Sequence, residues 1–357
     1  MKTGWLRPSL TCSGACAVAG PGATPDSTSA AHGSTHQRLR TVPTSAEHGT
    51  EQDHRSATAE SVLGAAAPPR GTPPGGPAYA GGVTAVLLDG GRLRARLVDA
   101  GPYAALDVVT VTGSTNTDLA AAASRGAADR TVLIAEEQRA GRGRMQRQWT
   151  SPRGQGLFVS VLLRPEVPQS AVSWVPLVAG IALAETVQRT TGVPARLKWP
   201  NDLLLGSGDE WRKAAGILGE AAAGPDGLAL VLGMGVNVLQ RPEDLPRGAG
   251  GLPATSLAAE GAEVDREEFA VALLTAFAEA EGSWRAASGD VVGSGLLDRY
   301  RALCSTLGQQ VRVELGPEEQ LRGVATDVDT EGRLVVRADS GRTTAVSAGD
   351  VVHVRPA

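Results

Sequence analysis

Residues 131–144 read TVLIAEEQRAGRGR, an apolar run that passes directly into a loop in which glycine and arginine alternate. The apolar run at 131–136 predicts a strand. In the loop, glycines let the backbone approach a ligand closely, while Arg142 and Arg144 offer planar guanidinium groups that bind carboxylate or phosphate through paired hydrogen bonds. The segment therefore predicts an anion-binding loop after a strand. A solvated basic turn and an arginine–glycine tract for RNA are the alternative interpretations.

The apolar pattern on either side of this loop predicts a mixture of strands and helices. Strands are expected at 106–111, 156–163, 195–199, 215–220 and 228–238, and helices from 115, from 174 to before Gly192, and over 266–285. This mixture predicts an α+β (mixed α/β) catalytic domain over residues 83–304. Short alternating strands at 311–315, 321–328, 334–337 and 351–354 predict a separate five-stranded barrel over residues 305–357.

Residues 1–82 have a different composition, rich in Ala, Gly, Pro, Ser and Thr and poor in periodic apolar residues. Such a segment buries too little apolar surface to offset its ordering entropy, which predicts a disordered, low-complexity N-terminal extension. It contains no pair of amphipathic helices resembling a helix-turn-helix. A mis-assigned translation start explains the segment equally well.

Composition limits the chemistry available to the rest of the chain. There are no histidines between residues 55 and 352, which excludes a Ser-His-Asp triad, a Cys-His pair and a histidine metal site there. A net charge of -4 argues against a chain built mainly to coat nucleic acid. The apolar runs are shorter than the ~20 residues of a membrane span. Three cysteines form no disulfide framework, which favours a reducing cytoplasm, with an N-terminal secretory signal as the weaker alternative.

Lysine is scarce, with 3 residues against 31 arginines, so each lysine beyond Lys2 is informative. Lys198 lies in the segment RLKWPND, residues 196–202, at the end of a predicted strand. A lysine there can stabilise negative charge that develops between a carboxylate and a phosphoryl group. Asp202 can position a divalent cation carried by a nucleotide. A strand and turn with a solvated lysine is the alternative.

Three further segments carry the remaining lysine and two of the three asparagines. In KAAGILGE, residues 213–220, Lys213 enters a strand, where a merely solubilising lysine is the alternative. In GMGVNV, residues 233–238, glycines within a strand indicate close approach of a ligand, and Asn237 can read a base edge or a ribose. In TGSTN, residues 112–116, helix N-terminal amides favour an anion or a polar ureido-like group, in addition to simple N-capping.

These five segments, in this order, resemble the biotin protein ligase family, the biotin–[acetyl-CoA-carboxylase] ligases. The most specific parts are the Gly-Arg-Gly-Arg loop with Trp149 and the Ser151-Pro152 pair after it, and the Lys-Trp-Pro-Asn-Asp motif. The resemblance covers about residues 106–356 and implies a biotin/lipoate-ligase-like mixed sheet flanked by helices, with a C-terminal SH3-like barrel. It also implies a two-step reaction in which biotin and MgATP give biotinyl-5′-AMP, and biotin then passes to a lysine of a carrier protein.

The resemblance also implies roles for individual residues. Lys198, Arg142 and Arg144 are the expected catalytic residues, with Lys198 between the biotin carboxylate and the α-phosphate. Expected biotin contacts are Ser114, Thr115, Asn116, Gln138, Gly141, Arg142, Gly143, Arg144, Lys198 and Gly216. Expected nucleotide contacts are Arg142, Arg144, Trp149, Asn201, Asp202, Lys213, Gly235 and Asn237, with Asp202 also a ligand of Mg²⁺.

The expected partner is the biotin carboxyl carrier protein or domain of acyl-CoA carboxylases, and the expected cofactors are ATP and Mg²⁺ with biotin as substrate. The N-terminal composition favours the monofunctional type without a DNA-binding domain. We expect no DNA or membrane partner, and a monomer or weak homodimer in the cytoplasm. A lipoyl or octanoyl ligase or transferase, which shares the fold, and a biotin-responsive DNA-binding repressor are the alternatives.

Overall fold

A computed structural model of the chain describes residues 86–208, 210–225, 227–246, 252–315, 320–347 and 350–353. These residues all belong to one compact unit. The extension predicted for residues 1–82 lies outside the described residues, as do Cys12 and Cys16.

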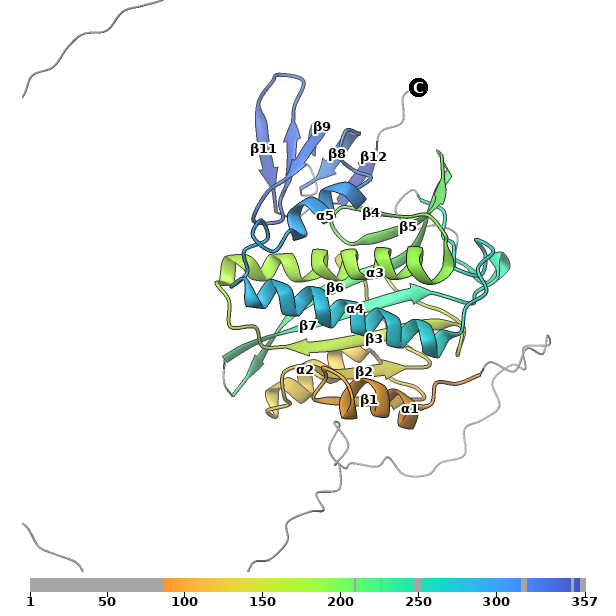
Figure 1. Cartoon of the computed structure of the whole chain (residues 1–357). Helices are drawn as coiled ribbons and strands as arrows, with labels where there is room; N and C mark the ends of the chain where they lie inside the picture. The colour runs from red at the N-terminus through yellow and green to blue at the C-terminus, as the bar shows by residue number, and fades with distance from the viewer. Residues whose placement is uncertain are drawn as a thin grey trace, which may run out of the picture. The chain divides into compact units, whose positions relative to one another are not determined.

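A seven-stranded mixed sheet forms the centre of the fold, with the order β1-β2-β3-β7-β6-β5-β4 (Figure 1). Its first pair, β1 and β2, is parallel, and all its other neighbours are antiparallel. The strands are β1 (Ala105–Val109), β2 (Thr131–Ala135), β3 (Gly156–Leu163), β4 (Ala195–Lys198), β5 (Asp202–Ser207), β6 (Glu210–Gly224) and β7 (Gly227–Asn237). The mixed sheet expected from the sequence is confirmed.

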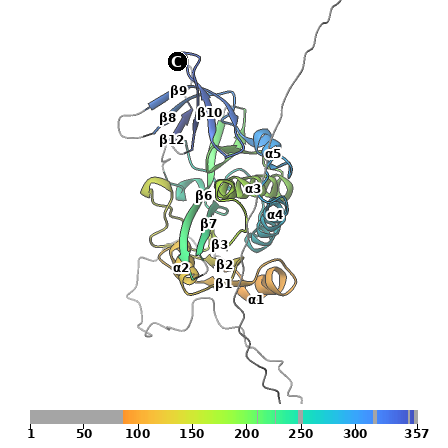
Figure 2. The same cartoon turned by 90° about the vertical axis from the view of Figure 1, so that its left-hand side faces the viewer.

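Helices cover both faces of this sheet (Figure 2). The longer helices, α3 (Val175–Thr191) and α4 (Arg266–Ala286), pack against each other on one face, and α2 (Thr115–Ser124) packs against β3, β6 and β7 on the other. All residues of β2 and β3 are buried, as expected for strands covered on both sides, which explains why they read as unbroken apolar runs.

Local signals explain where the two long helices begin and end. Pro176 lies in the first turn of α3, where its missing N–H costs nothing, and Gly192 ends the helix in the left-handed region at φ 71°. At the start of α4, the Asp265 carboxylate accepts hydrogen bonds from the amides of Glu267 and Glu268. Within the described residues, one helical stretch, Gln169–Thr191, is long and apolar enough to cross a membrane, but 67% of its apolar segment is buried inside the fold.

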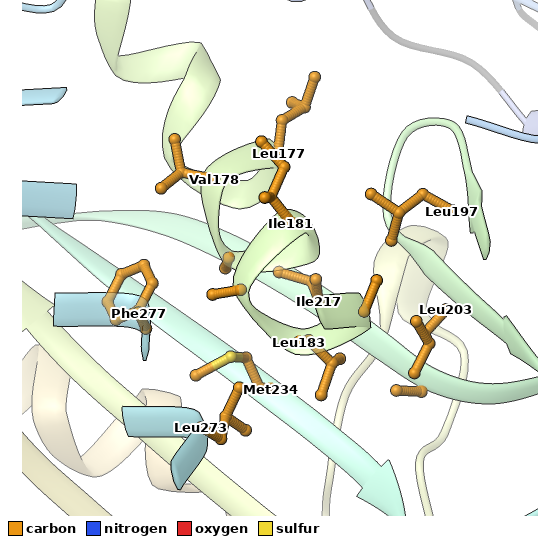
Figure 3. Close-up of a cluster of buried hydrophobic side chains, with 14 of the residues drawn as sticks. Leu177, Val178, Ile181, Leu183, Leu197, Leu203, Ile217, Met234, Leu273 and Phe277 are labelled. Carbon is orange, nitrogen blue, oxygen red and sulfur yellow. The ribbon is translucent and has the colours of Figure 1, made fainter. Parts of the chain in front are cut away.

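The main core lies between α3, α4 and the sheet (Figure 3). From the helices it contains Val178, Ile181, Leu273 and Phe277, and from the sheet it contains Leu197, Leu203, Ile217 and Met234. A smaller apolar cluster beneath α2 includes Leu119 and Leu133.

A second, five-stranded antiparallel sheet follows, with the order β11-β10-β9-β8-β12. Its strands are β8 (Gln310–Glu314), β9 (Gln320–Val328), β10 (Leu334–Arg337), β11 (Thr343–Val346) and β12 (Asp350–His353). The end strands β11 and β12 do not pair with each other in the described residues. The described strands therefore form a sheet and not a closed barrel. The division into separate domains at residue 305 stays a prediction.

Indole hydrogen bonds connect the turn between β9 and β10 of this second sheet to the preceding part of the chain. Trp174 Nε1 donates to the carbonyl of Thr330 at 2.8 Å, and Trp199 Nε1 donates to the carbonyl of Gly332 at 2.9 Å. Both tryptophan side chains are buried, and both acceptors lie in the turn between β9 and β10.

Some elements were not expected from the sequence. Strand β5 begins only four residues after β4 ends, and its short apolar run contains no alternation that would distinguish it from a turn region. The other unexpected helices are α5 (Leu296–Leu303), α1 (Gly90–Arg94) and the π-helical turn η1 (Ala95–Asp99), and the short 3-10 turns are η2 (Arg144–Gln146), η3 (Gln169–Trp174) and η4 (Pro242–Asp244).

The packing of the core predicts that two leucines contribute very differently to the free energy of unfolding. Leu273 of α4 is fully buried, whereas Leu228 of β7 is 70% exposed. We expect Leu273→Ala to lower the free energy of unfolding by about 2–5 kcal/mol, because it removes buried methyl groups and leaves a cavity. Leu228→Ala is the matched control and should change it by less than about 0.5 kcal/mol. Equal urea midpoints for the two variants would contradict this packing.

Candidate active site

A pocket lies where α2 begins, against the loop after β2 and the central strands β6 and β7. Most of the residues expected from the sequence line it. They are Ser114, Thr115, Asn116, Gln138, Arg142, Gly143, Arg144, Trp149, Asn201, Asp202, Lys213, Gly216, Gly235 and Asn237. Gly141 and Lys198 do not line it.

Three glycines form the floor of this pocket. Gly216 of β6 is paired in register with Gly235 of β7, and the ring of Trp149 lies on both. A Cβ atom on Gly235 would come within 2.5 Å of Trp149 Nε1, and one on Gly233 would come within 2.3 Å of Asn116 Oδ1. Successive residues of a strand face opposite sides, so Gly233, Gly235 and Asn237 face the pocket while the residues between them face the core. The glycines are therefore needed for close approach of side chains.

The indole N–H of Trp149 is buried and has no hydrogen-bond partner among the described residues. Buried donors are normally satisfied, so this group is available to an acceptor on a ligand. The ring also lies 5.6 Å from Lys213 Nζ, a cation–π distance.

Lys213 points into the pocket because of a β-bulge. The register between β5 and β6 passes from Leu203 opposite Ala215 to Leu204 opposite Lys213, which leaves Ala214 as an extra residue. An extra residue shifts the alternation of side chains, so Lys213 and Gly216 both face the pocket although they are three positions apart. Lys213 Nζ lies 2.6 Å from Asp202 Oδ1.

Lys198 does not line this pocket, and its expected contact with both substrates stays a prediction. It is the last residue of β4 and is only 6% exposed. Its positive charge helps to lower the pKa of His353 in the second sheet. In register, Lys198 pairs with Asp202 of β5, which does line the pocket, as does Lys213 of β6.

The glycine–arginine loop is a short hairpin. The amide of Gly143 donates to the Arg147 carbonyl at 2.7 Å, and the amide of Trp149 donates to the Gly141 carbonyl at 2.9 Å. A Cβ on Gly141 would lie 2.4 Å from the Trp149 carbonyl oxygen. Gly141 therefore closes the base of the hairpin instead of lining the pocket.

Both loop arginines line the pocket and contact side chains outside the loop. Arg142 Nη2 donates to Thr117 Oγ1 at 2.8 Å and lies 3.8 Å from Glu220 Oε1. Arg144 Nη1 lies 3.5 Å from Asn201 Oδ1. Arg142, Arg144 and Lys213 thus bring three positive groups to the lining of the pocket.

At the start of α2, Ser114 is the N-cap residue but makes no capping hydrogen bond with its side chain. Gln138 takes that role from the loop, since its Oε1 accepts from the Thr115 amide at 2.8 Å. The Asp118 carboxylate, in the first turn of the helix, accepts from Thr112 Oγ1. The hydroxyl of Ser114 therefore makes no capping hydrogen bond to the amides of α2.

Sequence reasoning missed two residues that contact Asn116. Ser160 of β3 lies 2.6 Å from Asn116 Oδ1, and Glu220 Oε2 accepts from Asn116 Nδ2 at 2.7 Å. A single serine within the apolar run GLFVSVLL was the available signal for the first of them.

The nucleotide-side residues are partly engaged within the protein. Asn237 Nδ2 donates to the Thr255 carbonyl at 2.9 Å, and Asn201 Nδ2 donates to the Ile217 carbonyl at 3.1 Å. Asp202 is the single carboxylate among the described residues that line the pocket. The described part of the chain contains no cluster of three His, Cys, Asp or Glu side chains suited to a resident metal ion.

Comparison with known proteins agrees with this geometry. Residues 108–237 match the biotin/lipoate A/B protein ligase family, and residues 306–354 match the biotin protein ligase C terminal domain. The biotin–[acetyl-CoA-carboxylase] ligase of Mycobacterium tuberculosis is 42% identical over 274 residues, which cover 75% of this chain and 96% of that protein. The chain belongs to the biotin protein ligase family.

Other members of the family show the same likeness. The biotin–[acetyl-CoA-carboxylase] ligase of Paracoccus denitrificans is 34% identical, over 65% of this chain and 93% of that protein. Among solved structures, the biotin protein ligase from Aquifex aeolicus in complex with biotin and ATP superimposes with a TM-score of 0.59 at 27% identity, covering 71% of this chain and 100% of that chain.

His353, the last residue of β12 in the second sheet, makes the free energy of unfolding depend on pH. Its Nε2 lies 3.1 Å from Thr306 Oγ1, which also accepts from the Trp199 amide. Burial, helped by the charge of Lys198, lowers the pKa of His353 to about 4. In the unfolded chain the pKa is about 6.5, so between these values only the unfolded chain binds the proton, and stability falls as the pH falls.

We therefore expect the parent chain to lose about 1–2 kcal/mol more stability than His353→Gln between pH 7 and pH 5, because glutamine does not titrate. Urea denaturation at both pH values measures this. Parallel losses in the two proteins would contradict the burial of a neutral His353.

Proposed function

We propose that this chain is a biotin–[acetyl-CoA-carboxylase] ligase, which uses ATP to activate biotin as biotinyl-5′-AMP and transfers biotin to a lysine of a biotin carboxyl carrier protein. The observation that carries the proposal is one pocket that joins a polar end at Ser114 to Asn116, a positively charged middle and an aromatic surface at Trp149. The named relatives and the biotin- and ATP-bound structure from Aquifex aeolicus support it.

In the first step, a carboxylate oxygen of biotin attacks the α-phosphorus of ATP, and pyrophosphate leaves. Both reactants are anions, so the main task of the protein is to offset their repulsion. Lys213, Arg142 and Arg144, which line the pocket, carry the positive charge that does so. We propose Lys213 for the place between carboxylate and phosphate that the family resemblance implies for Lys198, because Lys213 lines the pocket and Lys198 does not.

The nucleotide is proposed to lie on the glycine floor beside Trp149, a flat apolar surface suited to adenine. Mg²⁺ enters with the substrate as MgATP, held mainly by phosphate oxygens, as is usual for this ion. Asp202 is the proposed protein contact for it, and its present partner is Lys213 at 2.6 Å. Asn201 and Asn237 hold the nucleotide side of the pocket in shape through their bonds to main-chain carbonyls.

In the second step, the amine of the carrier lysine attacks the carbonyl carbon of biotinyl-5′-AMP, and AMP leaves. The nucleophile comes from the partner protein, which fits a pocket lined by no histidine or cysteine among the described residues. The mixed anhydride reacts with water, so the hairpin at 141–149 is proposed to close over it.

The match of residues 306–354 to a biotin protein ligase domain favours biotin over lipoate as the substrate. We further propose a monofunctional cytoplasmic enzyme, monomeric or weakly dimeric, that acts without DNA or a membrane. The net charge of -4 supports the absence of a nucleic-acid partner.

Biotin-dependent exchange of pyrophosphate into ATP tests the function and the assignment of the lysines together. We expect Lys213→Ala to lower exchange by about 1000-fold, because a charge that acts in the transition state is lost. Lys198→Ala is the comparison variant, and its exchange should exceed that of Lys213→Ala by at least about 10-fold. The reverse order would return the catalytic role to Lys198, and no exchange in the parent chain would reject the function.

Arg144 tests whether the loop retains the intermediate. We expect Arg144→Gly to release free biotinyl-5′-AMP into solution at least about 10-fold faster than the parent, since one charge-assisted contact is lost. Rapid filtration with labelled biotin measures the release. Arg189→Gly, at the end of α3 and outside the pocket, is the control, and equal retention in all three proteins would refute sequestration by the loop.

A further inference from the structure

Ser160 is an unusual residue in its strand. It is fully buried in the middle of β3, and every other residue of that strand is buried and has no polar side-chain group. Its hydroxyl oxygen lies 2.7 Å from Thr115 Oγ1 and 2.6 Å from Asn116 Oδ1, at the polar end of the pocket. Neither Ser160 nor Glu220 lines the pocket, yet both touch residues that do.

The direction of these hydrogen bonds follows from the chemistry of the groups. The two neighbours of Asn116 Nδ2 are the Glu220 carboxylate at 2.7 Å and the Leu218 carbonyl at 3.3 Å, which only accept. The amide nitrogen of Asn116 must therefore face them, and its oxygen must face Ser160. Because Asn116 Oδ1 only accepts, the single proton of Ser160 is donated to it.

Thr115 is then left as an acceptor toward the pocket. The Ser160 proton is already used, and the two hydroxyl oxygens lie 2.7 Å apart, so the Thr115 hydroxyl donates its own proton to Ser160 Oγ. Among the described residues, the lone pairs of Thr115 Oγ1 and the second lone pair of Asn116 Oδ1 then have no donor. The polar end of the pocket thus presents two acceptor oxygens.

We propose that Ser160 and Glu220 are positioning residues that orient Thr115 and Asn116 as acceptors for the N–H groups of a cyclic urea. This inference rests on the proposed function, since biotin carries such a ring. A dithiolane ring, as in lipoate, has no N–H group and would leave both oxygens buried and unpaired. A site built to bind an N–H group rejects an analogue that lacks it far more strongly than an apolar pocket would.

Glu220 also connects this recognition to the loop. One of its oxygens accepts from Asn116, and the other lies 3.8 Å from Arg142 Nη2. Glutamine at this position retains an acceptor for Asn116 but loses the charge that attracts Arg142, whereas alanine loses both. The two substitutions separate the positioning of Asn116 from the ion pair.

The experiment measures KM for biotin and for ATP in pyrophosphate exchange, and biotin affinity by calorimetry. We expect Ser160→Ala and Glu220→Ala to raise the biotin KM and Kd about 10-fold, with the ATP KM unchanged within about 2-fold, because only a hydrogen-bond orientation is lost. Glu220→Gln should keep the parent affinity for biotin. Inhibition by lipoate, measured relative to biotin affinity, should become stronger in the two alanine variants.

Ser124→Ala is the matched control, since Ser124 ends α2 on the exposed surface and bonds only to the main chain of its own helix. Thermal unfolding without ligand checks that each variant folds, and if Ser160→Ala does not, the contrast between Glu220→Ala and Glu220→Gln decides. Parent affinity for biotin in Glu220→Ala, or an equal rise of the biotin and ATP KM values, would overturn the inference. Loss of exchange in the parent chain with biotin binding intact would reject the ligase function alone.

Discussion

The absence of side chains on one patch of the central sheet is the constraint on which the site depends. Gly216, Gly233 and Gly235 occupy neighbouring positions of β6 and β7, and Trp149 and Asn116 lie in the space that Cβ atoms would fill. The loop after β2 and the first turn of α2 can therefore rest directly on the sheet. Their polar groups lie on this face of the sheet. Met234 and Val236, which alternate with the glycines of β7, belong to the main core together with residues of α3 and α4.

The charges of the pocket depend on a second local feature, the extra residue Ala214 in β6. Without that bulge, regular alternation would turn Lys213 toward the core, where an unpaired ammonium group is costly. With it, Lys213 lies beside Asp202 and Trp149. The C-terminal part of the chain stabilises the same region, since Thr306 and Gly332 accept hydrogen bonds from Trp199, which is close in the chain to Asn201 and Asp202.

Much of the fold and the site was predictable because the signals are local. The limits of β3, the end of α3 at Gly192 and the start of α4 follow from apolar runs, a left-handed glycine and a capping aspartate. The glycine–arginine loop was expected because alternating glycine and arginine after a strand is a local pattern that predicts anion binding. Strand β5 and Ser160 were not expected, because a short apolar run and a lone serine acquire meaning only from their neighbours in space.

The sequence by itself determined the residue inventory: lysines and asparagines concentrated in a few segments, and no histidine between residues 55 and 352. Those facts are enough to point to charge control without a protein nucleophile. Only the tertiary structure decided which lysine enters the pocket, because one bulge reverses the side on which a residue lies. It also decided how Asn116 is oriented, since that depends on Ser160 and Glu220, 44 and 104 residues away in the chain.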